Sequence, residues 1–190
     1  MNTQAHVVFN LALLGRKQQT EWNPLIILGA LIPDIAMFGF YAYMRLGTDI
    51  PEMQIWQVEY FKPSWQLLFA PFNSIPLALL GLGAMIYAKR TGLALMFGSV
   101  LLHCLGDLPL HHDDAHRHFW PFSDFRFISP VSYWHPEHYG GIVGPIEIVL
   151  MGAASIYVFR RVRSRWAKGL LIVANALPPV LYLWWVAAIP

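Results

Sequence analysis

Five long apolar runs set the limits on what this chain can fold into. They cover residues 24–44, 72–88, 93–110, 141–159 and 169–189. A helix needs about 20 apolar residues to cross the hydrocarbon core of a bilayer, which is about 30 Å thick. Charged residues make up 13% of the 190 residues, whereas soluble domains carry about 25%. The pattern therefore predicts a membrane protein and argues against a soluble globule.

A further apolar segment covers residues 3–15, which is short for a span and suits a helix packed against the others. Together the segments predict an all-α fold, a polytopic membrane helical bundle with five to six transmembrane helices. At about 150 residues per domain, the length predicts a single domain over residues 1–190. The polar, His-rich stretch at about 111–140 is the extramembrane loop of this domain.

The basic residues predict how the chain is oriented. Nine of the 13 Lys and Arg lie in three short connections, at residues 16–17, 89–90 and 160–168. Positive loops stay cytoplasmic, so alternating helices place the loop at 111–140 outside the cytoplasm of a plasma or inner membrane. The basic residues form no face with aromatic platforms, so we expect the lipid bilayer as a partner and no nucleic acid.

The richest chemistry lies at the end of the third long run. His103, Asp107 and His111 recur every four residues, so on an α-helix they share one face. Imidazole nitrogen and carboxylate oxygen bind divalent metals at about 2.0–2.2 Å, which predicts a metal site. Pro109 ends or bends such a helix, so either His111 or His112 is positioned to be the ligand.

Other ionisable residues extend this candidate site. His112 and His116 repeat the spacing of four, and five of the eight histidines lie within residues 103–118. Asp34 and Glu147 each lie inside an apolar run, shortly after a proline. Ionisable residues inside such runs are costly and mark functional sites. A divalent metal, with zinc the first choice for such ligands, is the expected cofactor.

Four motifs together resemble a known family. They are His6 near the start, the Leu-Ile-Pro-Asp sequence that ends at Asp34, the His-x3-Asp at His103 and Asp107, and the Trp-Pro-Phe-Ser sequence at 120–123. Over roughly residues 1–150 they resemble the membrane-bound, predicted metal-dependent hydrolases called YdjM-like. That family is distantly similar to the zinc-dependent phospholipase C and single-strand nuclease group. The resemblance implies hydrolysis of a phosphate ester or a lipid-like ester.

The resemblance also implies roles for particular residues. The implied metal ligands are His6, Asp34, His103, Asp107 and one of His111, His112 or His116. Asp34 or Asp107 would orient the attacking water, and His112 or His116 would protonate the leaving group, since imidazole titrates near neutral pH.

Two positions depart from the family pattern. Ala36 stands where the family has a second acid, and Asn73 stands where it has a histidine. The neutral amide of Asn73 is a poor substitute for imidazole at zinc. We therefore expect a site with fewer metals, a site that recruits other groups, or a loss of catalysis. The candidates for recruitment are His135, Glu137, His138 and Glu147.

Two other functions fit the same residues. In a transporter or channel, Asp34, His103, Asp107 and Glu147 would form a proton or cation path. Such proteins are usually built from related halves, and this sequence has no repeated half. In a haem or metal-binding structural protein, His6 and His103 would be axial ligands.

Overall fold

The structure is a bundle of helices, and the computed structural model describes residues 1–188. The longer helices are α1 (Thr3–Leu14), α2 (Asn23–Gly47), α5 (Ile75–Tyr87), α6 (Thr91–Asp107), α7 (Gly140–Arg161) and α8 (Arg165–Ala188). Short segments lie between them, namely η1 (Thr20–Trp22), α3 (Glu52–Gln54), the π-helical η2 (Ile55–Glu59), α4 (Pro63–Phe69) and η3 (Pro136–His138). No strand occurs within residues 1–188, so the all-α prediction is confirmed. Ile189, the end of the last apolar run, lies outside the described residues.

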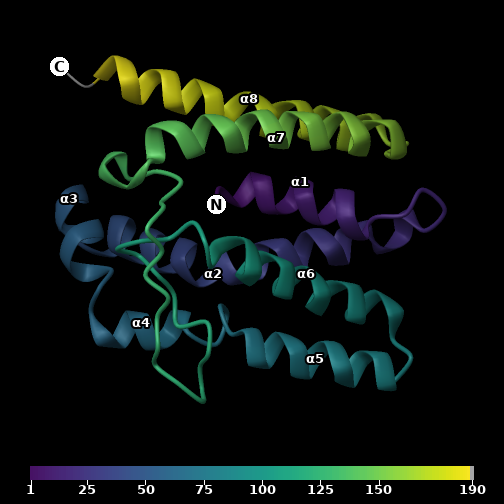
Figure 1. The fold of residues 1–190 in the computed structure, drawn as a ribbon, viewed down its shortest axis with the longest axis horizontal. Helices are drawn as coiled ribbons and strands as arrows, with labels where there is room; N and C mark the ends of the chain where they lie inside the picture. Colours follow the sequence, from purple (N-terminus) through teal and green to yellow (C-terminus); the bar gives the residue numbers. More distant parts are fainter. Residues whose placement is uncertain (189–190) are drawn as a thin grey trace.

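Figure 1 shows the long helices side by side, with α7 and α8 on one side of α1 and with α2, α6 and α5 on the other. The three basic connections, between α1 and α2, between α5 and α6 and between α7 and α8, lie at one end of the bundle. Arg161 Nη1 donates to Gly15 O at 2.9 Å and ties two of these connections together. The segment between α6 and α7 lies in the opposite half. Which side of a membrane each end faces stays a prediction.

Two helical segments are long and apolar enough to cross a membrane. They are Thr20–Gly47 and Gly140–Arg161, with mean hydropathies of 2.0 and 1.9 over 18 residues. The helices α5 and α6 have 13 and 17 residues, or about 20 and 26 Å at 1.5 Å per residue, which is less than the thickness of a bilayer core. The described residues thus offer two candidate spans, and the larger number predicted from sequence stays a prediction.

Close packing of α2 against α6 organises the centre of the bundle. A Cβ atom on Gly29 would lie 2.2 Å from Met96 O, so only glycine allows the two helices to approach this closely. Ser99 Oγ donates to Ile26 O at 2.6 Å, and Asn10 Nδ2 donates to Ser99 O at 2.9 Å. These buried hydrogen bonds join α1, α2 and α6, which carry the candidate site.

The end of α6 differs from the sequence prediction. The helix stops at Asp107, because Pro109 has no N–H group to donate the next backbone hydrogen bond. The prediction of one shared helix face therefore holds for His103 and Asp107 and is wrong for His111, which lies beyond the helix. Residues 108–135 contain no helix, so the later histidines are placed by loop structure and not by helical spacing.

Candidate metal centre

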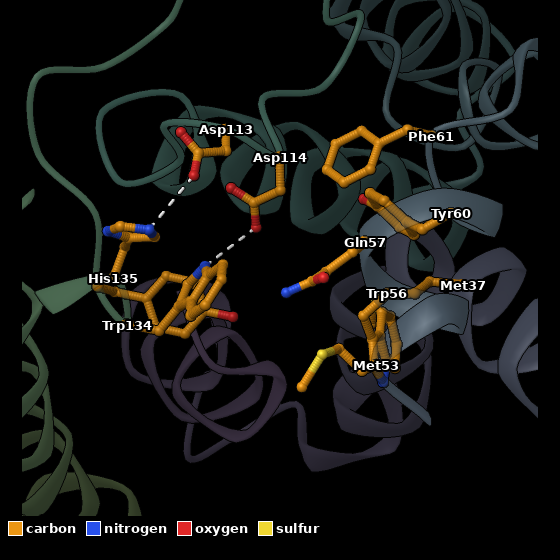
Figure 2. Close-up of a pocket in the computed structure, with 11 residues that line it drawn as sticks. Met37, Met53, Trp56, Gln57, Tyr60, Phe61, Asp113, Asp114, Trp134 and His135 are labelled. Carbon is orange, nitrogen blue, oxygen red and sulfur yellow. Dashed lines mark hydrogen bonds and ion pairs between the residues drawn. The ribbon is translucent and has the colours of Figure 1, made fainter. Parts of the chain in front are cut away.

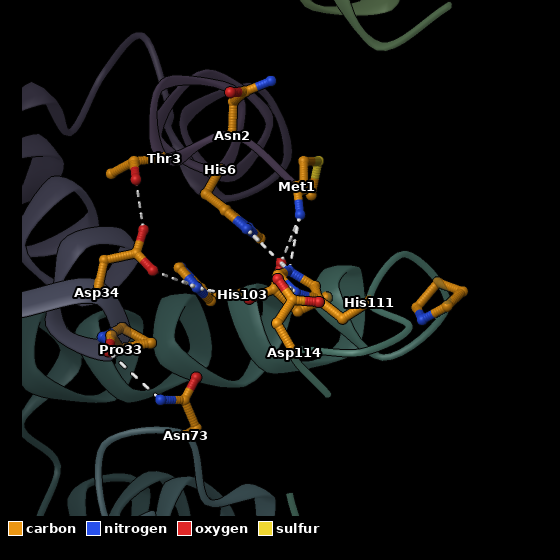
Figure 3. A network of polar contacts seen from close by, with 12 residues as sticks. Met1, Asn2, Thr3, His6, Pro33, Asp34, Asn73, His103, His111 and Asp114 are labelled. Carbon is orange, nitrogen blue, oxygen red and sulfur yellow. Dashed lines mark hydrogen bonds and ion pairs between the residues drawn. The ribbon is translucent and has the colours of Figure 1, made fainter. Parts of the chain in front are cut away.

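Asp107 is the centre of a buried cluster of histidines. His6 Nε2 lies 2.8 Å from Asp107 Oδ1, His103 Nε2 lies 2.9 Å from Oδ2, and His111 Nε2 lies 3.2 Å from Oδ1. The nitrogen of Met1 is a further neighbour, 2.8 Å from Oδ1. Asp107, His6 and His103 are each 2% exposed or less. Figure 3 shows the three imidazoles converging from α1, from α6 and from the segment after α6.

The orientation of His103 is compatible with a role as a metal ligand. Its Nδ1 lies 2.7 Å from Ala30 O, and because a carbonyl can only accept, Nδ1 is the protonated nitrogen. In a neutral ring, Nε2 would then be the unprotonated nitrogen and would direct its electron pair toward Asp107 Oδ2, 2.9 Å away. A metal ion held by both atoms would make this contact favourable, and so would a proton on Nε2. Histidine ligands of metals are oriented in this way by a hydrogen bond at the other nitrogen.

The rings of His6 and His103 are stacked, with centroids 3.5 Å apart and an interplanar angle of 8°. Both present Nε2 to the same carboxylate. Parallel rings at this separation leave no space for a porphyrin between them, so the axial haem arrangement considered from sequence is wrong. The group His6, His103 and Asp107 instead has its ligand atoms within 4.8 Å of one another, a geometry that can hold a metal ion.

Asp34 reaches the same cluster from α2. Its Oδ1 lies 3.6 Å from His103 Nε2, and its Oδ2 accepts a hydrogen bond of 2.5 Å from Thr3 Oγ1. The carboxylate is therefore held from α1 and directed toward the Nε2 edge of His103. Glu147, the other acid inside an apolar run, accepts hydrogen bonds from Asn2 N and Nδ2 at 2.9 and 2.7 Å and stands beside the cluster, not in it.

His111 links Asp107 to a second acid, Asp114. Its Nδ1 lies 2.9 Å from Asp114 Oδ2 while its Nε2 faces Asp107. The His116 ring lies 5.1 Å from the His111 ring, centroid to centroid. Asp107, His111 and His116 form a second group whose ligand atoms lie within 4.8 Å of one another. Asp107 belongs to both groups, so the cluster offers adjoining positions for metal ions.

Electrostatics favour a ligand role for His116. Burial lowers its pKa to about 3, so the ring is neutral at neutral pH. Burial acts to raise the pKa of Asp114, but the hydrogen bond and charge of His111 outweigh it, and the pKa lies below its ordinary value. A neutral imidazole beside ionised carboxylates is the form that binds metal. The same shift weakens the case for His116 as a proton donor to a leaving group.

His112, the remaining predicted ligand, lies elsewhere. Its Nε2 lies 3.3 Å from Asp113 Oδ1 and its ring stacks on His138. The structure thus gathers six of the seven predicted ligands around Asp107 and separates His112 from them. Those six are His6, Asp34, His103, Asp107, His111 and His116.

A cavity of about 700 Å³ lies beside the cluster, and Asp114 forms part of its wall. Figure 2 shows the acids Asp113 and Asp114 on one side and Met53, Trp56 and Phe61 on the other. Trp134 Nε1 donates to Asp114 Oδ2 at 3.2 Å and so connects the segment at 129–141 to this wall. One wall of the cavity is therefore acidic and next to the candidate metal ligands, and the opposite wall is apolar.

Sequence reasoning misses two residues of this region. The only sequence feature that could have identified Asp114 as part of the site is its position three residues after His111 in a polar loop. His118 is 3% exposed and donates from Nδ1 to Asn73 O at 2.9 Å. Asn73, where the resemblance expects a histidine, donates to Pro33 O at 3.4 Å and to Phe69 O at 3.2 Å. It braces the helix that carries Asp34 and supplies no ligand nitrogen.

The other departure from the family pattern, Ala36, is 8% exposed and packs in an apolar cluster with Phe40 and Tyr60. Comparison with protein-family models, with curated proteins and with solved structures finds no match to this chain. The chemistry of the site therefore rests on its own residues. Buried imidazole nitrogens and carboxylate oxygens, with His103 Nε2 lacking a hydrogen-bond partner among the described residues, fit a divalent metal.

Proposed function

We propose that this protein is a membrane-embedded, metal-dependent hydrolase that cleaves a phosphate ester or another ester of a lipid-like substrate. The observation that carries the proposal is Asp107, a buried carboxylate with three imidazole nitrogens between 2.8 and 3.2 Å away. Buried charges are retained in proteins when they are paired or coordinate metals. A cluster with this composition, next to a cavity of substrate size, is the expected form of a metal-dependent active site.

The membrane part of the proposal rests on the outer surface of the bundle. Leu80 on α5, Val149 on α7 and Leu170 on α8 are 70, 70 and 71% exposed. Large apolar side chains point outward along three helices, while the histidines and acids of the cluster point inward. Soluble monomers rarely expose continuous apolar surface of this kind. We infer that the shorter helices also lie in the bilayer, within a multi-pass arrangement.

The residues of the cluster would divide between holding metal and orienting water. His6, His103 and Asp107 would hold one ion, and Asp107, His111 and His116 would offer an adjoining position, with zinc as our first choice of metal. A bound divalent ion supplies hydroxide from water near neutral pH and neutralises charge on a phosphoryl oxygen. Asp34, restrained by Thr3, would accept a hydrogen bond from the attacking water and orient it.

The cavity indicates the kind of substrate. Its apolar wall would take an acyl or prenyl chain, and its acidic wall places the polar end of the molecule beside the metal-binding residues. The charges of Asp113 and Asp114 would repel a phosphate in the absence of bound cations. Substrate binding, like catalysis, is therefore expected to require the metal.

A hydrolysis assay on protein purified in detergent tests this proposal. The substrates are bis(p-nitrophenyl) phosphate and a short-chain phospholipid, with zinc supplied. We expect Asp34→Asn to lower kcat by about 10²-fold or more, as is typical for loss of a general base. Asp49→Asn removes an exposed acid of the loop after α2 and should leave the rate unchanged. Activity that survives both a chelator and Asp34→Asn would contradict the proposal.

A proton or cation path is the second candidate, because Asp34, His103 and Asp107 follow one another at 3.6 and 2.9 Å. Such a path predicts proton or cation flux in liposomes loaded with a pH-sensitive dye, and it predicts no bound metal. We favour the hydrolase because Glu147, the fourth group of the path, contacts Asn2 instead of continuing the series.

A further inference from the structure

A second group of histidines and an acid lies in the segment between α6 and α7, apart from Asp107. His112 Nε2 lies 3.3 Å from Asp113 Oδ1, and His135 Nε2 lies 3.4 Å from Asp113 Oδ2. The rings of His112 and His138 are stacked with centroids 3.5 Å apart. One ligand atom from each of His112, Asp113 and His138 lies within 4.8 Å of the others. Figure 2 shows the contact of His135 with Asp113 at the edge of the cavity.

Hydrogen bonds hold these residues in place from two separate stretches of chain. Ser129 N donates to His111 O at 3.1 Å, and His112 Nδ1 donates to Ser129 O at 2.5 Å. With Nδ1 as the donor, a neutral His112 ring directs the electron pair of Nε2 toward Asp113. Ser132 N donates to His138 O at 2.8 Å, which fixes the turn that carries His138. The ligand atoms are therefore positioned before any ion binds.

The distance between His112 Nε2 and Asp113 Oδ1 suits two ligands of one metal ion. At 3.3 Å it is slightly longer than the usual nitrogen-to-oxygen hydrogen bond of about 2.7–3.2 Å. In a tetrahedral zinc site with bonds of about 2.0–2.1 Å, neighbouring ligand atoms lie about 3.3–3.4 Å apart. Asp113 is 48% exposed, so an ion can enter from solvent.

The geometry points to a second divalent-metal site formed by His112, Asp113 and His138. Two imidazoles and one carboxylate, with a fourth position open to water, suit Zn²⁺. His135 holds the other oxygen of Asp113 and so orients the carboxylate, a contact typical of metal sites. A bound ion would fasten residues 112–113 to residues 135–138 and would fix the cavity wall that includes Trp134. The inference uses no residue of the Asp107 cluster and does not depend on hydrolysis.

Elemental mass spectrometry tests this site in the full chain, purified in detergent and equilibrated with zinc. We expect His138→Ala to lose about one zinc equivalent relative to wild type, and His138→Cys to keep it, because a thiolate replaces the imidazole. Asp124→Ala, which changes an exposed acid of the same segment, is the matched control. His112→Ala should reproduce the loss. Size-exclusion chromatography checks that each variant is folded.

A joint variant of the first site, His103→Ala with Asp107→Ala, separates the two proposals. It should lose the zinc of the Asp107 cluster and keep the zinc of the second site. If His138→Ala and His112→Ala hold as much zinc as Asp124→Ala, the second site is refuted. If only the joint variant loses zinc, the second site is refuted and the hydrolase proposal is unaffected.

Discussion

Replacing Gly29 with alanine tests whether the contact of α2 with α6 positions the candidate metal centre. The added Cβ would lie 2.2 Å from Met96 O and 2.8 Å from Ser99 Cβ, whereas ordinary contact begins at 3.4 Å. Neither atom is at the end of a flexible side chain, so the helices must separate by about 1 Å. Such overpacking costs about 1–3 kcal/mol. The separation also lengthens the 3.6 Å contact of Asp34 with His103.

The assays are thermal unfolding in detergent and hydrolysis rate. We expect Gly29→Ala to lower Tm by several degrees and to lower the rate by up to about 10²-fold, since a displacement of about 1 Å in an active site has effects of that size. Gly39→Ala is the matched control. Gly39 lies in the same helix as Gly29, and a Cβ atom there would have no neighbour within 4 Å. Equal Tm and equal rate for the two variants would refute the role assigned to this contact.

Three further changes have definite expected outcomes. Asn10→Ala leaves Ser99 without two buried hydrogen bonds and should lower the free energy of unfolding by about 1–3 kcal/mol, measured by denaturant titration. Ser74→Ala removes the side-chain cap of α5, which accepts from Leu77 N at 3.2 Å, and should cost about 1 kcal/mol in the same titration. Burial lowers the pKa of His118 below its ordinary value of about 6.5, so its contribution to stability is complete above pH 6.5 and is lost as the pH falls below it. Metal-stripped wild type should therefore lose stability between pH 7 and pH 5 by up to about 1.4 kcal/mol per pH unit more than His118→Gln, and equal slopes would contradict this.

Much of the fold and part of the site follow from the sequence. The all-α bundle and its short first helix follow from the length and apolarity of the segments. The contact of His103 with Asp107 can be predicted because two residues four apart in one helix lie on the same face. His6 and Asp34 come from other helices, and their participation depends on Gly29 and on the depth at which α1 packs.

The loop histidines could not be assigned from sequence, because residues 108–135 have no periodicity to read. Neighbouring residues there point to different clusters. His111 contacts Asp107, whereas His112 contacts Asp113. These directions depend on contacts between distant stretches, such as Ser129 with His111. Pro109 indicates that the helix ends, but it does not indicate where the chain goes next.

The most direct test of the central claim is the zinc content of wild type compared with the joint variant of His103→Ala and Asp107→Ala, both purified in detergent with zinc supplied. We predict that wild type holds at least one equivalent more than the variant, because both residues contribute ligand atoms to the same buried cluster. Equal zinc in the two folded preparations, or wild-type protein without bound metal, would contradict the proposed metal centre.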